Sequence, residues 1–376
     1  MTVDADVLVI GAGPSGCATA YDLAETGHSV LLLDHRSFPR LKPCGGALTA
    51  KTLLALRFSV EPVINHVIFD FVAGKGTHSR VDFKSKHPLG AMTIRTELDE
   101  FVLMRTLERG VRLEKIGRIT GIMEDHNGVT LHTVDRTYRS KFLVGADGTN
   151  STVRKLTCQF DESTWGFAIE GHVNNVDFDT RAMEFDFGVV DRGYGWVFPK
   201  RDHLNVGVYT YDRSVALLPK HLQEYVSSRL GPAEVTKVVG HPIAFGSWRY
   251  HPTLNRILLV GDAAGLCEPL LGEGIFYAVK SGQAAASAIH SEQKQPGTAR
   301  TTYARRLRYL QMDNRMAYAT ASQFYQHLDT GYRLLTTKPI YRCLLKGYAA
   351  GVPIGEIERT WFSSLPFRPI PKWSGA

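Results

Sequence analysis

Three glycines near the beginning of the chain have the spacing of a nucleotide-binding turn. In DVLVIGAGPSGCATA, Gly11, Gly13 and Gly16 fit the pattern G-x-G-x-x-G. The first glycine permits a tight turn, the second lets the backbone approach a pyrophosphate, and the third lets a helix pack closely on a strand. Pro14 and Ser15 stand where that helix begins, and its N-terminal amides and dipole would favour bound phosphates.

The residues around this turn predict a strand–helix–strand unit. Residues 7–10 and 30–33 are short, continuous apolar runs of the kind found in buried strands, and they predict two strands. Asp34 follows the second strand, 18 residues after Gly16, with His35 next to it. A carboxylate at this position accepts hydrogen bonds from an adenosine ribose and disfavours a 2′-phosphate. We therefore expect FAD or NAD here rather than NADP.

Two later glycine motifs favour the flavin. KFLVGADGTNSTVR places a predicted strand before Asp147, and RILLVGDAAG places another before Gly261 and Asp262. A dinucleotide longer than NAD needs a carboxylate near its ribityl hydroxyls, which is the natural role for Asp262. A backbone N–H cluster at a helix start suits the pyrimidine edge of an isoalloxazine. Such a cluster is expected at Gly272, Gly274 and Ile275.

An arginine precedes a further predicted helix in IRTELDEFVLMRTLERG. Arg95 stands just before apolar residues at helical spacing, and Gly110 ends the pattern. An arginine so placed can reach the phosphates or the chain of a flavin. A surface arginine at a helix start is the alternative.

Alternating aromatic residues predict strands in the middle of the chain. RAMEFDFGVV alternates apolar and polar positions, and residues 194–199 and 204–211 continue the pattern. Tyr194, Trp196 and Phe198 share one face of a regular strand. They could form a closed aromatic core or the wall of a site for a flat or apolar ligand.

Composition narrows the class of protein. The chain has 376 residues, 44% hydrophobic and 22% charged, which suggests a globular protein of two domains. Its net charge is +7, and between residues 300 and 346 only Asp313 and Asp329 oppose nine basic residues. Amphipathic basic helices there could pack on the protein or lie on an anionic membrane. No nucleic-acid motif accompanies the charge, so we expect no nucleic-acid partner.

The cysteines and the apolar segments indicate where in the cell the protein is expected. Five scattered cysteines without CxxC or Cys/His spacing predict no metal site and favour a reduced, cytoplasmic setting. No basic signal-peptide start is visible, and no apolar run approaches the roughly 18 residues that span a bilayer. Peripheral attachment to a membrane stays open.

The order of these motifs resembles the FAD-dependent family that includes the aromatic hydroxylases. Three stretches resemble its geranylgeranyl reductases more closely, namely KPCGGAL (42–48), YGWVFPKRDHLNVG (194–207) and VGDAAGLCEPLLGEGIFYAVKSG (260–282). The family motif Tyr-x-Trp-x-Phe-Pro is matched by Tyr194, Trp196, Phe198 and Pro199. The likeness extends over about residues 1–290, and the rest matches mainly in position and character.

The resemblance implies an α/β fold. A Rossmann-type FAD-binding domain would be interleaved with an antiparallel β-sheet substrate domain and followed by a basic helical C-terminal region. The expected boundaries are 1–60, 92–157 and 250–295 for the first domain, 61–91 and 158–249 for the second, and 296–376 for the helical region.

The resemblance also implies an activity. Reduced FAD would pass a hydride to one carbon of an isoprenoid double bond, and a proton would reach the other carbon. Cys44, Gly45 and Gly46 would approach the flavin ring, and Tyr194, Trp196, Phe198 and Pro199 would contact the substrate. Cys44, Tyr194 and Trp196 are the catalytic candidates, and Cys44, Tyr194 or water could supply the proton.

Several alternatives stay open. The electron donor could be NAD(P)H or a reduced ferredoxin-like protein. An oxygen-using monooxygenase or halogenase acting on an aromatic or hydrophobic small molecule is the first rival, because flavin halogenases carry Trp-x-Trp-x-Ile-Pro. Tyr194 in place of the first tryptophan and the KPCGGA stretch favour the reductase. A non-catalytic flavoprotein that binds a lipid or a partner is the second rival.

Overall fold

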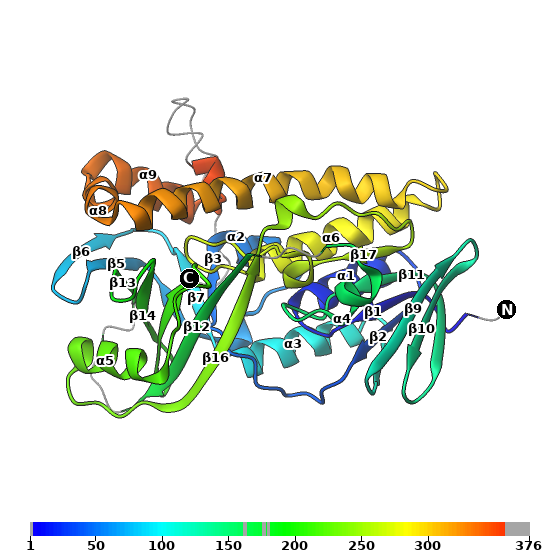
Figure 1. The fold of residues 1–376 in the computed structure, drawn as a ribbon, viewed down its shortest axis with the longest axis horizontal. Coiled ribbons are helices and arrows are strands. Elements are labelled where there is room, and N and C mark those ends of the chain that lie inside the picture. The colour runs from blue at the N-terminus through cyan, green and yellow to red at the C-terminus, as the bar shows by residue number, and fades with distance from the viewer. Residues whose placement is uncertain (1–2, 161–163, 175–177, 179–180, 358–376) are drawn as a thin grey trace.

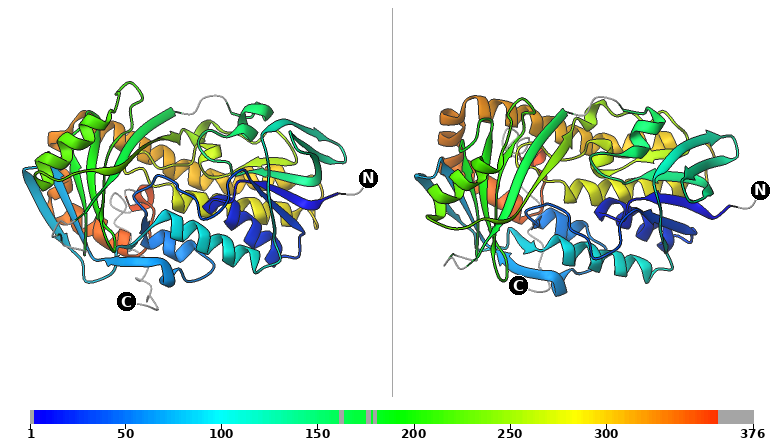
Figure 2. Two further views of the ribbon diagram at one scale, coloured as in Figure 1. Left: turned by 90° about the horizontal axis from the view of Figure 1, so that it is seen from below. Right: turned by 60° about the horizontal axis from the view of Figure 1, so that its bottom comes forward.

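The computed structural model of the chain describes residues 3–160, 164–174, 178 and 181–357. Its elements form two large sheets with helices on their faces. Figure 1 shows the two sheets side by side along the long axis, with α7 running over both. The views in Figure 2 place the second sheet, in green and light blue, at one end and the first sheet, in dark blue and teal, at the other.

The first sheet contains the predicted nucleotide-binding unit. Its order is β8 (Arg112–Lys115), β2 (Val30–Asp34), β1 (Ala5–Ile10), β11 (Thr137–Gly145), β10 (Gly128–Thr133) and β9 (Ile119–Asp125). β17 (Ile257–Leu259) pairs in parallel with the end of β11, beyond the part that pairs with β10. β8, β2, β1, β11 and β17 are parallel neighbours, and β1 and β2 are almost wholly buried, as continuous apolar strands of a covered parallel sheet should be.

Helices cover this sheet and its loops. α1 (Pro14–Glu25) and α6 (Ile275–Ser291) pack against each other, and α3 (Arg95–Leu107) packs beside α1. α4 (Thr152–Thr157) follows β11, and a short 3-10 turn, Gly261–Ala264, follows β17. Two further 3-10 turns lie at Glu61–Val63 and Ser247–Arg249.

The second sheet joins distant parts of the chain. Its order is β16 (Thr236–Phe245), β12 (Thr164–Val173), β15 (Leu204–Thr210), β14 (Gly193–Pro199), β13 (Ala182–Phe187), β5 (Asp70–Lys75) and β6 (Ser79–Lys84). Its pairings are antiparallel except that of β13 with β5, which is parallel. The two sheets and their helices confirm the predicted α/β class, while the exact domain boundaries stay predictions.

Period-2 alternation divides the second sheet into two faces. Val197, Val206 and Val208 belong to one core, with α5 (Pro219–Leu230) packed against it. Tyr194 and Trp196 belong to the opposite core, which the C-terminal helices cover. A smaller sheet, β3 (Ala47–Thr49), β7 (Gly90–Thr93) and β4 (Ile64–Ile68), lies with α2 (Ala50–Ala55) between the large sheets.

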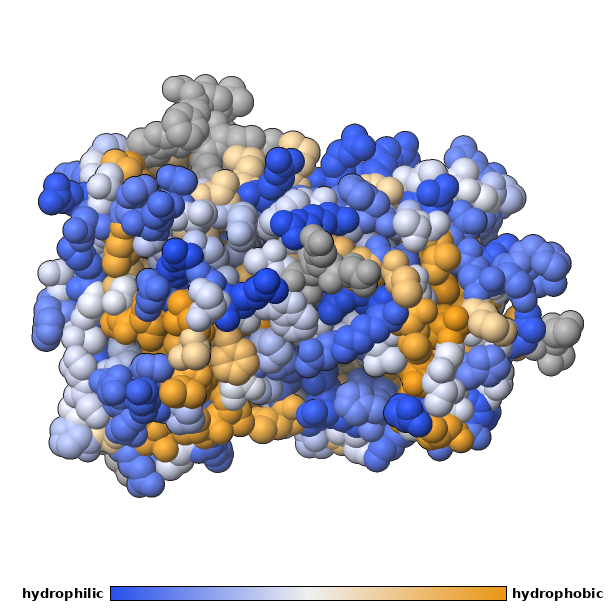
Figure 3. Space-filling view, viewed as in Figure 1, coloured by the Kyte–Doolittle hydropathy of each residue, from blue (hydrophilic) through white to orange (hydrophobic). Residues whose placement is uncertain are grey.

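The basic C-terminal region folds onto the protein. It consists of α7 (Ala299–Gln326), α8 (Leu328–Thr336) and α9 (Lys338–Ala349) within the described residues, and 358–376 lie outside them. α7 packs through Leu307 and Leu310 on the first core and through Ala317 and Ala321 on the second. Hydrophilic side chains line the surface along α7, and apolar ones gather lower, over the second sheet (Figure 3). Among the described helices, none is both long and apolar enough to cross a membrane.

Candidate active site

A large cavity extends from the glycine turn of the first sheet to the C-terminal helices. Its volume is about 1800 Å3, and its walls come from the loops of the first sheet, the aromatic face of the second sheet and α7–α9. Typical small-molecule sites enclose roughly 300–1,000 Å3. The cavity therefore has room for a dinucleotide and a second ligand.

Most of the residues proposed from the sequence line this cavity. They are Gly11, Gly13, Pro14, Ser15, Asp34, His35, Cys44, Gly45, Gly46, Arg95, Asp147, Asp262, Gly272, Gly274, Ile275, Tyr194, Trp196 and Phe198. The fold thus brings the separate motifs to one place.

Three proposed residues do not line the cavity, and each has a packing role. A Cβ on Gly16 would lie 1.8 Å from the Gly11 carbonyl oxygen, so α1 could not approach β1 with any other residue there. Gly261 packs against the side chain of Ser15. Pro199 pairs with the first residue of β15 at the end of the sheet.

The glycine turn and Asp34 form the nucleotide end of the cavity. The Asp34 carboxylate accepts hydrogen bonds of 2.8 Å from the backbone amides of Ala12 and Arg36. These bonds fix the acid at the end of β2, beside the turn. An adenosine ribose would meet the carboxylate at this position.

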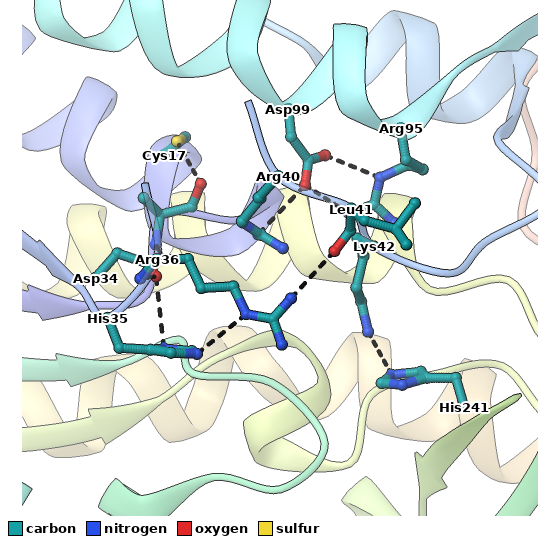
Figure 4. Close-up of polar contacts among 11 residues, drawn as sticks. Cys17, Asp34, His35, Arg36, Arg40, Leu41, Lys42, Arg95, Asp99 and His241 are labelled. Carbon is teal, nitrogen blue, oxygen red and sulfur yellow. Dashed lines mark hydrogen bonds and ion pairs between the residues drawn. The ribbon is translucent and has the colours of Figure 1, made fainter. Parts of the chain in front are cut away.

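Two arginines converge on one buried carboxylate next to the turn (Figure 4). Arg95 binds both oxygens of Asp99 at 2.8 and 2.9 Å, and Arg40 reaches Asp99 at 3.2 Å. Arg95 was predicted as a cofactor ligand, but its guanidinium already holds a bidentate partner. Arg40 was missed from the sequence, although its Nη2 lies 3.2 Å from the position of a Cβ on Gly13.

The surroundings of Arg40 fit a pyrophosphate. Its Nε is buried and has no hydrogen-bond partner among the described residues. Gly13 leaves open the space beside the same guanidinium. An anion held between this turn and Arg40 would satisfy the free donor, so the site has both the shape and the charge that FAD requires.

The loop that carries Arg40 also reaches the second sheet. Lys42 contacts Nε2 of His241 on β16 (Figure 4). Burial lowers the pKa of Lys42, and burial together with Lys42 lowers the pKa of His241 to about 4. Lys42 therefore donates to a neutral imidazole.

The two acids predicted near the flavin chain differ in their contacts. Asp147 accepts hydrogen bonds from the Ser151 hydroxyl and from the backbone amides of Thr152 and Val153, so it caps α4. Burial raises the pKa of Asp147. Among the described residues, the Asp262 carboxylate accepts only a long, 3.3 Å hydrogen bond from a threonine hydroxyl, and it is the freer of the two carboxylates for a ligand.

Tyrosines hold the loop that precedes α6. Tyr194, Tyr209 and Tyr325 donate hydrogen bonds of 2.6 Å to the carbonyls of residues 271, 269 and 270. Glu268 accepts from the amides of residues 270 and 271, and burial raises its pKa to about 7. Glu273 binds Lys51 at 2.7 Å. The loop leading to 272–275, where the N–H cluster is predicted, is therefore held in place.

The Cys44 loop packs against the aromatic strand β14. A Cβ on Gly45 would lie 2.8 Å from the Phe198 ring and 3.4 Å from Trp196 Nε1. Lys200, after β14, donates to the carbonyls of Gly45 and Thr93. Burial lowers the pKa of Lys200 to about 8. The double glycine is thus required by close packing as well as by any approach to a flavin.

Glu170 and Asn205 support this loop, and sequence analysis missed both. The Cys44 amide donates to Glu170 at 2.8 Å, and Trp196 Nε1 donates to Asn205 at 2.8 Å. Asn205 also interacts with the Glu170 carboxyl and opposes the rise in its pKa, so the two contacts lie beside each other. The sequence signal that could have identified Glu170 is its position as a lone acid in the apolar run GFAIEG.

The aromatic wall lies on the cavity face of the second sheet. Tyr194, Trp196 and Phe198 are 4–7% exposed and share that face, as their spacing predicted. Phe185 contacts Tyr194 and Phe198 with ring centroids 5.3 Å apart. The wall is both part of an aromatic core and part of the cavity, so the two interpretations of the sequence describe one surface.

The C-terminal helices supply the rest of the apolar wall. Phe324 of α7, Leu335 of α8, and Tyr341 and Leu345 of α9 line the cavity opposite the sheet. Their apolar positions recur at helical spacing in the sequence, but nothing in the sequence showed which surface they cover.

Comparisons with known proteins agree with this site. Residues 4–306 match a family model described as an FAD binding domain. A menaquinone reductase of Mycobacterium tuberculosis is 31% identical, with 77% of this chain and 78% of that protein covered. A digeranylgeranylglycerophospholipid reductase of Methanococcus vannielii is 27% identical over 74% of each chain.

Solved structures share the fold. A geranylgeranyl bacteriochlorophyll reductase-like protein from Thermoplasma acidophilum has a TM-score of 0.78 at 19% identity, covering 96% of this chain and 99% of that one. A flavin-dependent brominase has a TM-score of 0.74 at 17% identity, covering 96% and 98%. The cofactor is FAD, and the chain belongs to the FAD-binding family of flavin-dependent oxidoreductases that includes the geranylgeranyl reductases.

Proposed function

We propose that the protein is an FAD-dependent reductase that saturates carbon–carbon double bonds of an isoprenoid chain. The supporting observation is the continuity of the cavity, which has glycine turns at one end and an apolar aromatic wall at the other. FAD supplies hydride chemistry when bound and reduced. A long hydrocarbon substrate needs the apolar half of such a cavity and few polar anchors.

The chain's own residues would hold the reactants. The turn at Gly11–Gly16 and Arg40 would bind the pyrophosphate, with Asp34 on the ribose and Asp262 on the ribityl chain. Gly45, Gly46 and the amides of 272–275 would border the flavin ring. Trp196, Phe198 and Phe185 would keep water from the double bond.

The names of the relatives support an isoprenoid substrate. One relative is named for a digeranylgeranyl phospholipid and another for menaquinone. These names share a polyprenyl chain but differ in the head group. We therefore propose the chain as the common feature of the substrate, held against the aromatic wall.

The proposal extends to the electron donor and to the place of the protein in the cell. NAD(P)H bound transiently, or a reduced ferredoxin-like protein, would reduce the flavin. We place the protein in the cytoplasm, with peripheral contact to a membrane where prenyl lipids are found. The flavin absorbance is followed anaerobically after NADPH or reduced ferredoxin is added. The donor that reduces the flavin is thereby identified.

The deciding experiment is an anaerobic half-reaction. FAD in the purified protein is reduced with dithionite and mixed with geranylgeranyl diphosphate, and flavin absorbance and lipid mass are followed. We expect reoxidation with a mass gain of two hydrogens per saturated bond. Trp196→Ala should retain FAD and lose this reoxidation.

The rival oxygen-using activity predicts a different result. In a monooxygenase or halogenase, reduced flavin would persist with the lipid and be reoxidised only when oxygen is admitted. The experiment is repeated with a prenyl quinone and with a prenyl phospholipid. If the reduced flavin is reoxidised only by oxygen with all of these lipids, the reductase proposal is refuted.

A further inference from the structure

A buried lysine, Lys200, follows the aromatic strand β14. It is 5% exposed and begins the turn between β14 and β15. Lysines are almost never fully buried unless an acid is paired with them. Among the residues that the structure describes, no carboxylate forms an ion pair with Lys200. Its ammonium instead donates to the carbonyls of Gly45 and Thr93, at 2.6 and 3.0 Å. Packing alone does not explain a cation at this position.

Lys200 lies behind the Cys44–Gly46 loop rather than in the cavity. All three loop residues line the cavity, whereas Lys200 and Thr93 do not. Lys200 binds the carbonyl of Gly45. The amide and the hydroxyl of Thr93 donate to the carbonyl of Gly46 at 2.8 and 3.0 Å. Both carbonyl oxygens of the double glycine therefore accept from groups that lie outside the cavity wall.

This arrangement suits a ring that gains negative charge. Reduction of a flavin at neutral pH adds two electrons and one proton, so the reduced ring carries one more negative charge than the oxidised ring. A carbonyl oxygen directed at the ring would repel that charge, and a cation behind the loop attracts it. The attraction is stronger in a buried site than in water, and charge near a flavin tunes its electronics.

The charge of Lys200 is not cancelled by its contacts. Arg95, another cation beside this loop, is bound by Asp99 through two hydrogen bonds (Figure 4). The partners of Lys200 are the two carbonyls and the sulfur of Met92. Burial lowers the pKa of Lys200 to about 8, against the opposing effects of Cys44 and Glu170. The ammonium is therefore mostly charged at pH 7.

We propose that Lys200 is a positioning residue that turns the Gly45 carbonyl away from the flavin and raises the reduction potential of bound FAD by its positive charge. It acts from behind the loop and touches no substrate. This inference rests on the position proposed for the flavin ring, beside Gly45 and Gly46, and is independent of the substrate. It assigns a role to a residue outside the cavity wall.

The test compares how tightly the protein binds oxidised and reduced FAD. Lys200→Met keeps the length of the side chain and removes its charge, and Lys200→Gln removes the charge but keeps an N–H donor. Both variants are titrated with dithionite at pH 7 against a reference dye. Relative to wild type, each should favour oxidised FAD about tenfold or more, which lowers the midpoint potential of a two-electron couple by about 30 mV. The flavin spectrum and the melting temperature show whether each variant binds FAD and folds.

Two controls separate the effect of charge from that of loop geometry. Glu170→Gln alters the other contact of the same loop without removing a positive charge, so it should not lower the potential. Lys280→Met removes a partly buried lysine of α6 that donates to Gln283 at 3.2 Å and does not line the cavity. It should keep the preference for reduced FAD within about twofold of wild type. Equal falls in Glu170→Gln and Lys200→Met would mean that loop geometry sets the potential, and would overturn the proposal.

Two other results would also overturn it. Potentials of both neutral variants equal to that of wild type would show that the charge has no effect. Loss of FAD or of folded protein in both would assign Lys200 to the fold alone. The titration contains no lipid, so its result stands whether or not the protein reduces an isoprenoid chain. Absence of lipid-dependent reoxidation would count against the reductase function and leave the role of Lys200 as measured.

Discussion

Glu170 on β12 accepts a 2.8 Å hydrogen bond from the backbone amide of Cys44, a residue 126 positions earlier in the chain. Glu170 is 8% exposed and lines the cavity beside the aromatic wall. Its carboxyl also interacts with Asn205, which accepts a hydrogen bond from Trp196 Nε1, so this acid lies close to both the KPCGG loop and the Tyr-x-Trp-x-Phe-Pro strand. The two motifs therefore come together beside this acid.

Two substitutions of Glu170 should separate the effect of its hydrogen bond on stability from the effect of its charge. Glu170→Gln keeps a side-chain oxygen for the Cys44 amide, whereas Glu170→Leu leaves that partly buried amide unpaired. We expect the leucine variant to lose about 1–3 kcal/mol of unfolding free energy and the glutamine variant clearly less. Denaturant unfolding of both variants measures this difference. Equal losses would mean that the hydrogen bond is not what holds the loop.

The stability of the same variants should depend on pH. Burial raises the pKa of Glu170 above its usual 4.5, although the Cys44 amide, Lys200, Asn205 and Arg95 oppose the shift. As pH rises from 4.5 through the raised value, the unfolded chain loses its proton more readily than the folded protein, so this residue's contribution to stability falls. The melting temperature of Glu170→Gln relative to wild type should therefore rise with pH above 4.5. A constant difference would contradict the raised pKa.

Tyr194 should prove to be a structural residue rather than a proton source. Its hydroxyl donates to a carbonyl of the loop before α6, as that of Tyr209 does, and burial raises the pKa of both. Tyr194→Phe and Tyr209→Phe should each cost about 1–3 kcal/mol of stability, because each leaves a carbonyl oxygen of this loop without its donor. Both variants should keep turnover within about tenfold of wild type.

Stopped-flow reoxidation of the reduced flavin measures that turnover. A loss of about 100-fold or more in Tyr194→Phe alone would instead assign Tyr194 as the general acid, since such groups contribute about 10²–10⁴-fold. Tyr209→Phe is the control for the loop itself.

Gly45 should tolerate no side chain. A Cβ there would meet Cδ2 and Cε2 of the Phe198 ring at 2.8 Å, and the backbone would have to move away from the aromatic wall. Gly45→Ala should weaken FAD binding about tenfold and change the visible spectrum of the bound flavin. Gly121→Ala is the matched control, because its Cβ would meet nothing closer than 3.5 Å. Unchanged spectra in both variants would place the flavin ring elsewhere.

Local patterns explain which parts of the site could be predicted from the sequence. The turn at Gly11–Gly16 and the acid at Asp34 are set by spacing within one strand–helix–strand unit. The shared face of Tyr194, Trp196 and Phe198 follows from the two-residue period of a strand. Each of these inferences needs only residues that are close in sequence.

The parts that could not be predicted depend on distant pairings. Glu170 lies near Trp196 because β12 and β14 both pair with β15, where each of the two residues is opposite Gly207. The Cys44 amide that Glu170 accepts comes from a loop 126 positions earlier. Arg40 approaches Gly13 because its loop folds back over the glycine turn. Arg95 forms an ion pair with Asp99, which lies one helical turn further along α3. The amphipathic pattern of α8 and α9 identified helices, but it could not show that their apolar faces close a cavity.

His241 should make the protein lose stability in mild acid. Burial and Lys42 lower its pKa to about 4, from a usual value of 6.5. Between pH 6.5 and 4 the unfolded chain takes up a proton that the folded protein excludes, so stability falls as pH falls. The loss that this residue causes is at most about 3 kcal/mol.

His241→Gln isolates this effect. Glutamine keeps an oxygen that can accept a hydrogen bond from Lys42, but it does not titrate. Its melting temperature should match that of wild type near pH 7 and exceed it increasingly down to pH 4, because protonated His241 would place a second positive charge against Lys42. Thermal melts at constant FAD concentration across this range measure the difference. Parallel curves for the two proteins would show that His241 is protonated freely and that the contact with Lys42 does not persist.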